Sequence, residues 1–273
     1  MSRRVRLDAE LVRRGLARSR EQAVATIAAG RVRVGGRTAT KAATMVDGAE
    51  AIVVADADDP GYASRGAWKL LGALDAFGAA DPPLHVTGRR CLDAGASTGG
   101  FTDVLLRRGA REVVAVDVGY GQLLWRLQAD PRVRVVDRTN IRAVTPDLLG
   151  GLCDLVTSDL SFISLPVVLP ALRGAATDDA DFVLLVKPQF EVGRDRLGAG
   201  GVVREPELHA SAVIGVATAA ARLGLGARGV VASPLPGPAG NVEYVLWLAG
   251  GAPPLDAAAV SAAVAAGPAG ARV

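Results

Sequence analysis

The chain has 273 residues, of which 50% are hydrophobic, and its formal net charge is +3 at pH 7. This length allows one large domain, or a large domain with a small module. No stretch approaches the roughly 18 apolar residues of a membrane helix, and the start, MSRRVRLDAELVRR, lacks the apolar region of a secretory signal. The two cysteines, Cys91 and Cys153, lie in apolar stretches, which predicts reduced core residues in a cytoplasmic protein without a membrane partner.

The positive charge is concentrated at the N-terminal end. Residues 1–41 contain eleven basic and three acidic side chains, whereas residues 42–273 contain twenty basic and twenty-five acidic ones. A local excess of cations on a short segment is typical of a module that binds a polyanion. We therefore expect nucleic acid as its partner, and a solvated basic surface without a partner is the alternative.

Residues 1–59 are predicted to form a small α+β domain. LDAELVRR has leucines four apart on one helix face, and SREQAVATIAAG begins with Ser19 and Gln22 in the spacing of a capping box. RVRVGGRTAT alternates apolar and polar residues around Gly35 and Gly36, the pattern of a tight hairpin. The basic side chains expected to point outward are Arg13, Arg14, Arg18, Arg20, Arg31, Arg33 and Arg37.

A polar, turn-rich segment follows, and we interpret residues 60–66 as a linker. Strands alternate with helices from residue 88 onward, within a domain that we bound at 67–250, and an Ala-, Gly- and Pro-rich tail occupies 251–273. The strands are expected near 90–94, 113–117, 133–136, 154–158 and 182–186. This alternation predicts an α/β fold with a doubly wound, Rossmann-like, mostly parallel sheet, helices on both faces, and ligands at the carboxyl ends of the strands.

The turn DAGASTGG, at residues 93–100, has three interpretations. It is not the dinucleotide fingerprint G-x-G-x-x-G, because Ser97 occupies the second glycine position. GASTG matches the G-x-S-x-G elbow of hydrolases, and His209 follows the serine, but the elbow would then follow the first strand of the domain, which is early for that fold. A nucleoside cofactor is favoured, since small residues let the backbone approach a ligand and Asp117 can accept hydrogen bonds from a ribose diol. A turn for some other nucleotide is the alternative.

Lysine is rare in this chain, which has only Lys41, Lys69 and Lys187 among 31 basic residues. Lys187 ends an apolar run in LLVKPQF, and Asp159 ends another in CDLVTSDL. Arginine stays charged in any protein, whereas a shielded lysine can lose its proton. The pattern therefore indicates a reactive lysine at a strand end, and a structural salt bridge between Lys187 and Asp159 is the alternative.

The N-terminal segment resembles the S4 RNA-binding domain, in the spacing R-L-D…G…S-R…A…I…G-x-V-x-V-x-G. In that family two helices present basic residues to structured RNA. By position, the resemblance implies RNA contacts at Arg4, Arg6, Arg18 and Arg20.

The turn D-x-G-x-x-x-G-G resembles motif I of S-adenosylmethionine-dependent methyltransferases. The resemblance implies S-adenosyl-L-methionine as cofactor, with Asp93 holding its amino-acid portion directly or through water and Asn140 near its adenine. The implied cofactor-binding residues are Asp93, Gly95, Ala96, Ser97, Thr98, Gly99, Gly100, Phe101, Asp117 and Asn140.

The order Lys69, Asp159, Lys187, Glu243 resembles the catalytic tetrad of FtsJ-type RNA 2′-O-methyltransferases. Together with SRGAWKL, VDVGYGQL, DLSFISL, VKPQFEVG and SPLPGPAGNVEYVLWL, it is similar to the TlyA, or haemolysin A, family of ribosomal RNA methyltransferases. The resemblance implies methylation of a ribose 2′-hydroxyl, of cytidine in 16S or 23S RNA, with ribosomal subunits rather than DNA as partners and Arg65 contacting RNA.

In this mechanism Lys187 would take the proton or stabilise the developing alkoxide, Asp159 would orient Lys187, and Glu243 would position the ribose or Lys69.

Two alternatives to this function remain. One is an S4 protein that binds RNA without catalysis, and the other is a membrane-active haemolysin, for which the sequence has no amphipathic or spanning segment.

Overall fold

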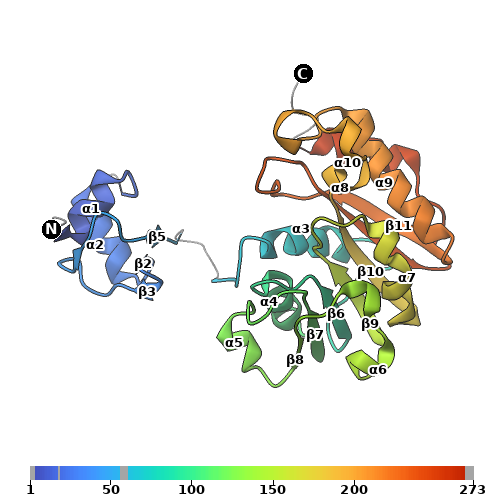
Figure 1. Cartoon of the computed structure of the whole chain (residues 1–273), viewed down its shortest axis with the longest axis horizontal. Helices are drawn as coiled ribbons and strands as arrows, with labels where there is room; N and C mark the ends of the chain where they lie inside the picture. Colours follow the sequence, from blue (N-terminus) through green and yellow to red (C-terminus); the bar gives the residue numbers. More distant parts are fainter. Residues whose placement is uncertain (1–3, 18, 56–60, 268–273) are drawn as a thin grey trace. The chain divides into compact units, whose positions relative to one another are not determined.

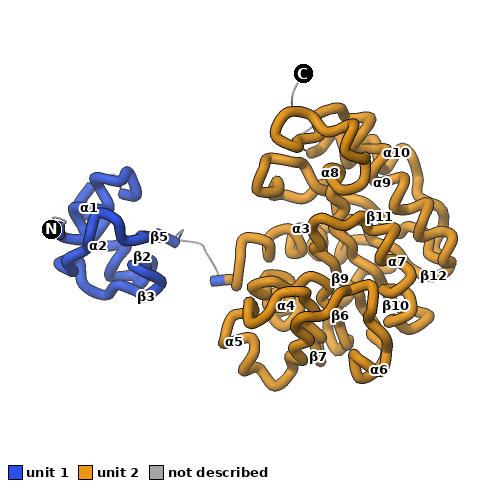
Figure 2. Tube along the Cα trace, in the orientation of Figure 1, with its two compact units in different colours: residues 1–61 blue, residues 62–273 orange. Residues whose placement is uncertain are grey.

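The protein is described from a computed structural model that covers residues 4–17, 19–55 and 61–267. Arg18, one of the expected RNA contacts, lies outside these residues. The chain forms two compact units, Met1–Gly61 and Tyr62–Val273 (Figure 2).

The small unit contains two helices and short antiparallel strands around its own core. Its elements are β1 (Val5–Arg6), α1 (Leu7–Arg13), α2 (Arg20–Ala28), β2 (Val32–Val34), β3 (Arg37–Thr38), β4 (Met45–Val46) and β5 (Ile52–Val54). The Ser19 hydroxyl accepts a hydrogen bond from Gln22 N at 3.1 Å, which confirms the predicted cap. Gly35 and Gly36 have φ of 53° and 80° between the paired strands β2 and β3, so the hairpin is also as predicted.

A buried carboxylate organises the first helix of this unit. Glu10 accepts hydrogen bonds from Arg13 at 2.6 Å and Arg14 at 2.7 Å, and these two guanidinium groups lower its pKa to about 2. Arg14 also donates to the backbone carbonyl groups of Gly48, at 2.9 Å, and Glu50, at 2.8 Å. The expectation that Arg14 points outward was therefore wrong, because this side chain ties α1 to a loop.

The large unit is built on one seven-stranded sheet with the order β11-β12-β10-β9-β6-β7-β8 (Figure 1). Its strands are β6 (Arg90–Ala94), β7 (Glu112–Val116), β8 (Val133–Val136), β9 (Cys153–Ser158), β10 (Ala176–Val186), β11 (Leu225–Ala232) and β12 (Tyr244–Gly250). Its helices are α3 (Ala67–Gly78), α4 (Gly100–Arg107), α5 (Trp125–Gln128), α6 (Pro146–Leu149), α7 (Leu165–Gly174), α8 (Pro188–Glu191), α9 (Pro206–Ala221) and α10 (Ala257–Ala266), with short 3-10 turns at Ile141–Ala143, Arg194–Arg196 and Ala199–Gly201. β8, β7, β6, β9 and β10 are parallel, and β12 runs antiparallel to both of its neighbours, as a mostly parallel sheet predicts.

Side chains that alternate along the strands form a separate core on each face of the sheet. Leu92 and Val156 pack with α7, α9 and α10, whereas Cys91 and Leu155 pack with α3 and α4. This arrangement confirms the predicted helices on both faces. Cys91 and Cys153 are free and buried, as expected for core residues.

Two boundaries of the large unit differ from the sequence interpretation. Part of the expected linker belongs to the unit, since Ala63 N donates to the buried carboxylate of Asp103 at 2.8 Å. Residues 257–266 of the expected tail form α10, because Val260 and Val264, four apart, bury one stripe in the core next to α9. Along the described parts of the chain, no helix has the length and apolar character that crossing a membrane requires.

Candidate active site

Two adjoining cavities open at the carboxyl ends of the parallel strands. The larger measures about 610 Å³ and is lined by Ser64, Arg65, Gly66, Lys69, Gly95, Ala96, Ser97, Thr98, Gly100, Phe101, Asp159, Ser161, Lys187, Leu235, Pro236, Gly237, Pro238 and Gly240. The smaller measures about 470 Å³ and is lined by Gly95, Ser97, Val116, Asp117, Val118, Gln122, Thr139, Asn140, Ile141, Asp159, Leu160, Ser161, Phe162 and Ile163. Gly95, Ser97, Asp159 and Ser161 line both, so these residues stand at the junction.

Strand register brings the candidate residues to this edge. β6 and β9 pair in parallel so that Gly95, which follows β6, meets Asp159, which follows β9. β10 and β12 pair antiparallel with Val186 opposite Tyr244, so Lys187, which follows β10, and Glu243, which precedes β12, lie at the same edge. Residues far apart in the sequence therefore meet because of the sheet topology.

The glycine turn after β6 lies close against its neighbours. Gly95 has φ of 89°, and a Cβ atom there would lie 2.8 Å from the carbonyl oxygen of Asp159. Gly99 has φ of 98°, and a Cβ there would meet Leu123 and Leu127. Only glycine satisfies both demands, so the backbone of the turn itself forms a wall of the cavities.

Asp117 holds the turn from the next strand. One carboxylate oxygen accepts a hydrogen bond from Ser97 N at 2.8 Å, and the other accepts one from Gly119 N at 2.7 Å. Each carboxylate oxygen has a second lone pair, so Asp117 can still accept from a hydroxyl in the smaller cavity. Asn140 lines the same cavity, and its side-chain oxygen accepts from Arg142 N at 3.0 Å.

Asp93 lies behind the turn and not on a cavity wall. Its side chain is fully buried, and Oδ2 accepts from the Thr102 hydroxyl at 2.6 Å. Oδ1 has no hydrogen-bond partner among the described residues. Burial raises the pKa of Asp93 to about 7, against the lowering effect of the Thr102 hydrogen bond. This oxygen is therefore placed to accept from one further donor, such as ordered water.

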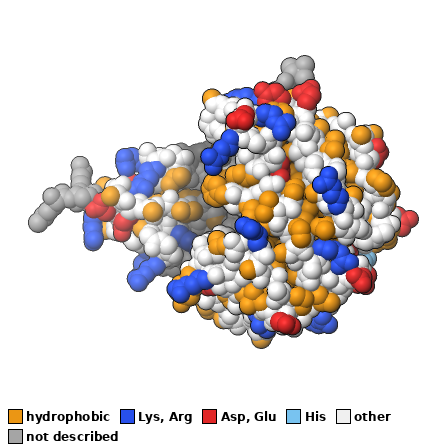
Figure 3. Space-filling model, turned by 45° about the vertical axis from the view of Figure 1, so that its right-hand side comes forward, with side chains coloured by type: hydrophobic (Ala, Val, Ile, Leu, Met, Phe, Trp, Pro, Cys, Tyr) orange, Lys and Arg blue, Asp and Glu red, His pale blue; other side chains and the backbone are white. Residues whose placement is uncertain are grey.

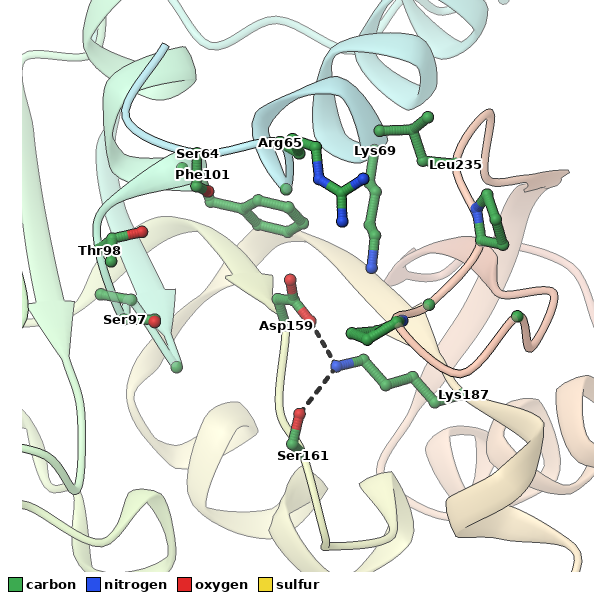
Figure 4. Close-up of a pocket in the computed structure, with 18 residues that line it drawn as sticks. Ser64, Arg65, Lys69, Ser97, Thr98, Phe101, Asp159, Ser161, Lys187 and Leu235 are labelled. Carbon is green, nitrogen blue, oxygen red and sulfur yellow. Dashed lines mark hydrogen bonds and ion pairs between the residues drawn. The ribbon is translucent and has the colours of Figure 1, made fainter. Parts of the chain in front are cut away.

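The four tetrad candidates form two ion pairs rather than one chain of contacts, and Figure 4 shows the pair of Lys187 and Asp159. Lys187 Nζ lies 2.6 Å from Asp159 Oδ1, and Lys69 Nζ lies 2.5 Å from Glu243 Oε2. Both lysine side chains are nearly buried, with 9% and 10% of their surface exposed, respectively, and both line the larger cavity. Each ammonium group thus has a carboxylate partner beside the cavity, and Arg65 adds a further cation to its lining.

Two further residues of the site were not singled out from the sequence. Ser161 Oγ lies 3.1 Å from Lys187 Nζ. Phe162 is 92% exposed, has φ of 63°, and packs its ring against Phe190 with centroids 5.4 Å apart. The sequence feature that could have indicated them is their position, because both residues follow Asp159 shortly after the end of β9.

The structure excludes the hydrolase interpretation of the GASTG stretch. His209 is fully buried, its Nε2 lies 3.1 Å from the carbonyl oxygen of Val203, and its ring meets Tyr244 edge-on. The Ser97 hydroxyl contacts Gln122 at 3.4 Å instead. The serine and the histidine are therefore not paired for nucleophilic catalysis.

In the small unit, two of the candidate RNA-binding arginines meet at one acid. Arg6 donates two hydrogen bonds to Asp8, at 3.1 and 2.9 Å, and an Arg20 nitrogen lies 3.8 Å from the same carboxylate. Arg4 is exposed. Figure 3 shows basic side chains on the visible surface of this unit.

Comparison with known proteins decides the family. The model of the FtsJ-like methyltransferases matches residues 62–249, which contain both cavities and all four tetrad candidates. The chain belongs to the FtsJ-like methyltransferase family. The S4 domain model matches residues 5–52, within the small unit.

Relatives with known names share nearly the whole length of this methyltransferase. The 16S/23S rRNA (cytidine-2′-O)-methyltransferase TlyA of Mycobacterium tuberculosis is 61% identical over 91% of each chain. A protein named Hemolysin A from Brachyspira hyodysenteriae is 34% identical over 88% of this chain and 98% of its own. Among solved structures, a putative hemolysin from Streptococcus thermophilus matches with a TM-score of 0.73 and 37% identity, over 97% of this chain and 96% of that one. The family and the fold imply S-adenosylmethionine as the methyl donor.

Proposed function

We propose that this enzyme transfers a methyl group from S-adenosylmethionine to the ribose 2′-hydroxyl of a cytidine in ribosomal RNA, in 16S or 23S RNA or in both, in the cytoplasm. The observation that carries the proposal is the pair formed by Asp159, at the junction of the two cavities, and Lys187, which lines the larger one. The 61% identity to a named rRNA (cytidine-2′-O)-methyltransferase supports the substrate.

The glycine turn, the buried Asp93 behind it and the smaller cavity fit the methyl donor. The glycine turn admits a ligand along its backbone, and the orphaned oxygen of buried Asp93 fits a water that reaches an ammonium group. In this proposal Gly95 and Ser97 contact the amino-acid portion, Asp117 accepts from the ribose hydroxyl groups, and Asn140 lies beside the adenine. The cofactor supplies a sulfonium-bound methyl group, which is a strong electrophile.

The acceptor ribose would occupy the larger cavity, which holds the lysines. Its 2′-hydroxyl is a weak nucleophile, and the neutral amine form of Lys187 takes the proton from it, becoming an ammonium paired with Asp159, as the oxygen attacks the methyl carbon and the sulfur departs. Asp159 orients Lys187 through their 2.6 Å contact. The Lys69–Glu243 pair positions the sugar, Arg65 binds an adjacent phosphate, and the exposed ring of Phe162 gives a surface on which an unstacked base can lie.

The small unit would bind structured RNA through phosphates. Asp8 fixes the guanidinium of Arg6 and stands 3.8 Å from Arg20, so one buried acid presents two cations together. Guanidinium groups suit phosphate because their fork of donors binds two oxygens at once. We propose Arg4, Arg6, Arg18 and Arg20 as the phosphate contacts and ribosomal subunits as the partner.

Binding to ribosomal RNA should weaken with salt. With about four to six phosphate contacts, the slope of log affinity against log salt is expected to be about −3 to −5. The double variant Arg6→Ala, Arg20→Ala should reduce the magnitude of that slope by roughly 1.4 to 1.8, because two contacts are lost. Filter binding to purified subunits across a salt series measures the slope.

The matched control is Arg173→Ala, which removes an arginine paired with Asp178 in the large unit. Its slope should equal that of the wild type. An unchanged slope in the double variant, with circular dichroism showing a folded protein, contradicts the assignment of these two arginines.

The function itself is tested by transfer of tritiated methyl from S-adenosylmethionine to purified 30S and 50S subunits, with wild type and Lys187→Ala side by side. We expect label in RNA that resists alkaline hydrolysis at one dinucleotide and is absent with the variant. Label that alkali releases as ordinary nucleotides would refute ribose methylation. If neither subunit is labelled although the protein binds the cofactor, two interpretations stay open: the protein binds RNA without catalysis, or it methylates a different RNA.

Membrane lysis is the second candidate, because several of the similar proteins carry the name hemolysin. Leakage of a dye from liposomes, caused by purified and lipid-free protein at micromolar concentration, would support it. We expect no leakage above that caused by a heat-denatured sample.

A further inference from the structure

Ser161 holds a position in the site that neither the ion pairs nor the cofactor turn accounts for. It lines both cavities, and its hydroxyl oxygen lies 3.1 Å from Lys187 Nζ (Figure 4). Asp159 Oδ1 lies 2.6 Å from the same nitrogen. The lysine nitrogen therefore has two oxygen partners, both from the segment that follows β9.

These two partners limit the directions left to the nitrogen. A neutral lysine amine has two N–H groups and one lone pair in a tetrahedral arrangement. If one N–H donates to Asp159 and the other to Ser161, both donors are fixed, and the lone pair takes the remaining direction. With Asp159 alone, the amine can rotate about its Cε–Nζ bond, and the lone pair has no fixed direction.

The segment that carries Ser161 is itself held against the turn after Lys187. Glu191, in α8, accepts a hydrogen bond from the Ser164 hydroxyl at 2.6 Å and another from Leu165 N at 2.9 Å. Because α8 begins directly after Lys187, Glu191 ties the lysine-bearing turn to the Ser161-bearing loop. The contact between Ser161 and Lys187 is thus supported from both sides by the fold.

We propose that Ser161 is a positioning residue, which fixes the Lys187 amine so that its lone pair faces the 2′-hydroxyl proton. The inference rests on the proposed function, because that function identifies the proton as the one on the ribose 2′-hydroxyl. The contact between Ser161 and Lys187 does not depend on the proposed function. The reaction needs a correctly oriented amine, because a general base acts only when its lone pair lies within hydrogen-bond reach of the proton that it removes.

Kinetics test the role of Ser161. Ser161→Ala should lower kcat about ten- to a hundredfold, the worth of one hydrogen bond to a charged or reacting group. KM for RNA and Kd for S-adenosylmethionine, the latter by calorimetry, should change less than about threefold, since the residue acts through Lys187. Ser161→Thr keeps the hydroxyl and should restore most of kcat. Ser261→Ala is the matched control, because it also removes a hydroxyl that donates one hydrogen bond, to the Ala257 carbonyl at 3.0 Å, but it lies in α10 and lines neither cavity, and its kcat should stay within twofold of wild type.

A kcat of Ser161→Ala within twofold of wild type would overturn the proposal. A large rise in Kd for the cofactor with normal kcat would also overturn it, because Ser161 would then be a cofactor-binding group.

A second measurement stands apart from the reaction. The chain has only three lysines, so labelling with ¹³C-lysine gives few Cε–Hε signals to assign by NMR. In Ser161→Ala the Lys187 signal should shift and its ¹³Cε relaxation should report increased motion, while Lys41 stays unchanged. If wild type fails to methylate RNA but this change is seen, the proposed function fails and the positioning contact stands. If the Lys187 signal of Ser161→Ala is the same as that of wild type, the positioning contact is refuted, whatever the methyltransferase activity of the variant.

Discussion

Lys187→Arg should lose catalysis while keeping the fold and the cofactor site. Arginine retains the positive charge and can reach Asp159, but its guanidinium stays protonated at any working pH and cannot accept a proton. General bases contribute about 10² to 10⁴ to rate, and we expect kcat to fall within that range. Single-turnover methyl transfer with saturating RNA and cofactor measures the chemical step without interference from product release.

Two variants make this test specific. Lys187→Ala should be equally inactive if the proton transfer is what is lost, since both variants lack the base. Lys41→Arg, at an exposed position of the small unit, should retain full activity. Near-normal turnover of Lys187→Arg would assign the lysine a purely electrostatic role and refute the general base.

Replacing Asp93 by asparagine should change how stability depends on pH. The pKa of this carboxyl is raised to about 7 in the fold, mainly by burial, whereas an aspartate in the unfolded chain titrates near ~3.9. Between these two values the native state binds a proton that the unfolded state has released, so wild-type stability falls as pH rises through this window. The asparagine side chain cannot titrate, and the wild type should lose about 2–3 kcal/mol relative to Asp93→Asn between pH 5 and pH 8.

Urea unfolding followed by tryptophan fluorescence checks this prediction. Trp68, Trp125 and Trp247 all lie in the large unit, so the signal reports the unit that contains Asp93. Thr102→Val, which removes the donor to Asp93 Oδ2, should extend the loss of stability to higher pH, because that hydrogen bond favours the charged carboxylate and its removal raises the pKa of Asp93 further. Parallel stability profiles for wild type and Asp93→Asn would show that Asp93 is ionised in the fold at neutral pH.

Much of the fold could be predicted because its signals are local. The cap at Ser19 and the hairpin at Gly35 and Gly36 depend on neighbouring residues and on φ values that glycine adopts freely. α10 was missed because an Ala-rich segment has little periodic contrast, and only the position of α9 and β11 shows which of its sides is buried. Arg14 was misjudged for a related reason, since the loop carbonyl groups that it binds lie more than thirty residues away in the chain.

The sequence by itself determined the α/β class, the glycine turn, and the residues that follow each strand, because strand ends and small-residue turns leave local patterns. Only the tertiary structure decided which of those residues meet. Lys69 pairs with Glu243 across 174 positions, and Lys187 is held between Asp159 and Ser161, whose role no pattern indicated. The physical reason is strand register: hydrogen bonds between neighbouring strands fix which ends stand side by side, and those bonds form between residues far apart in the chain.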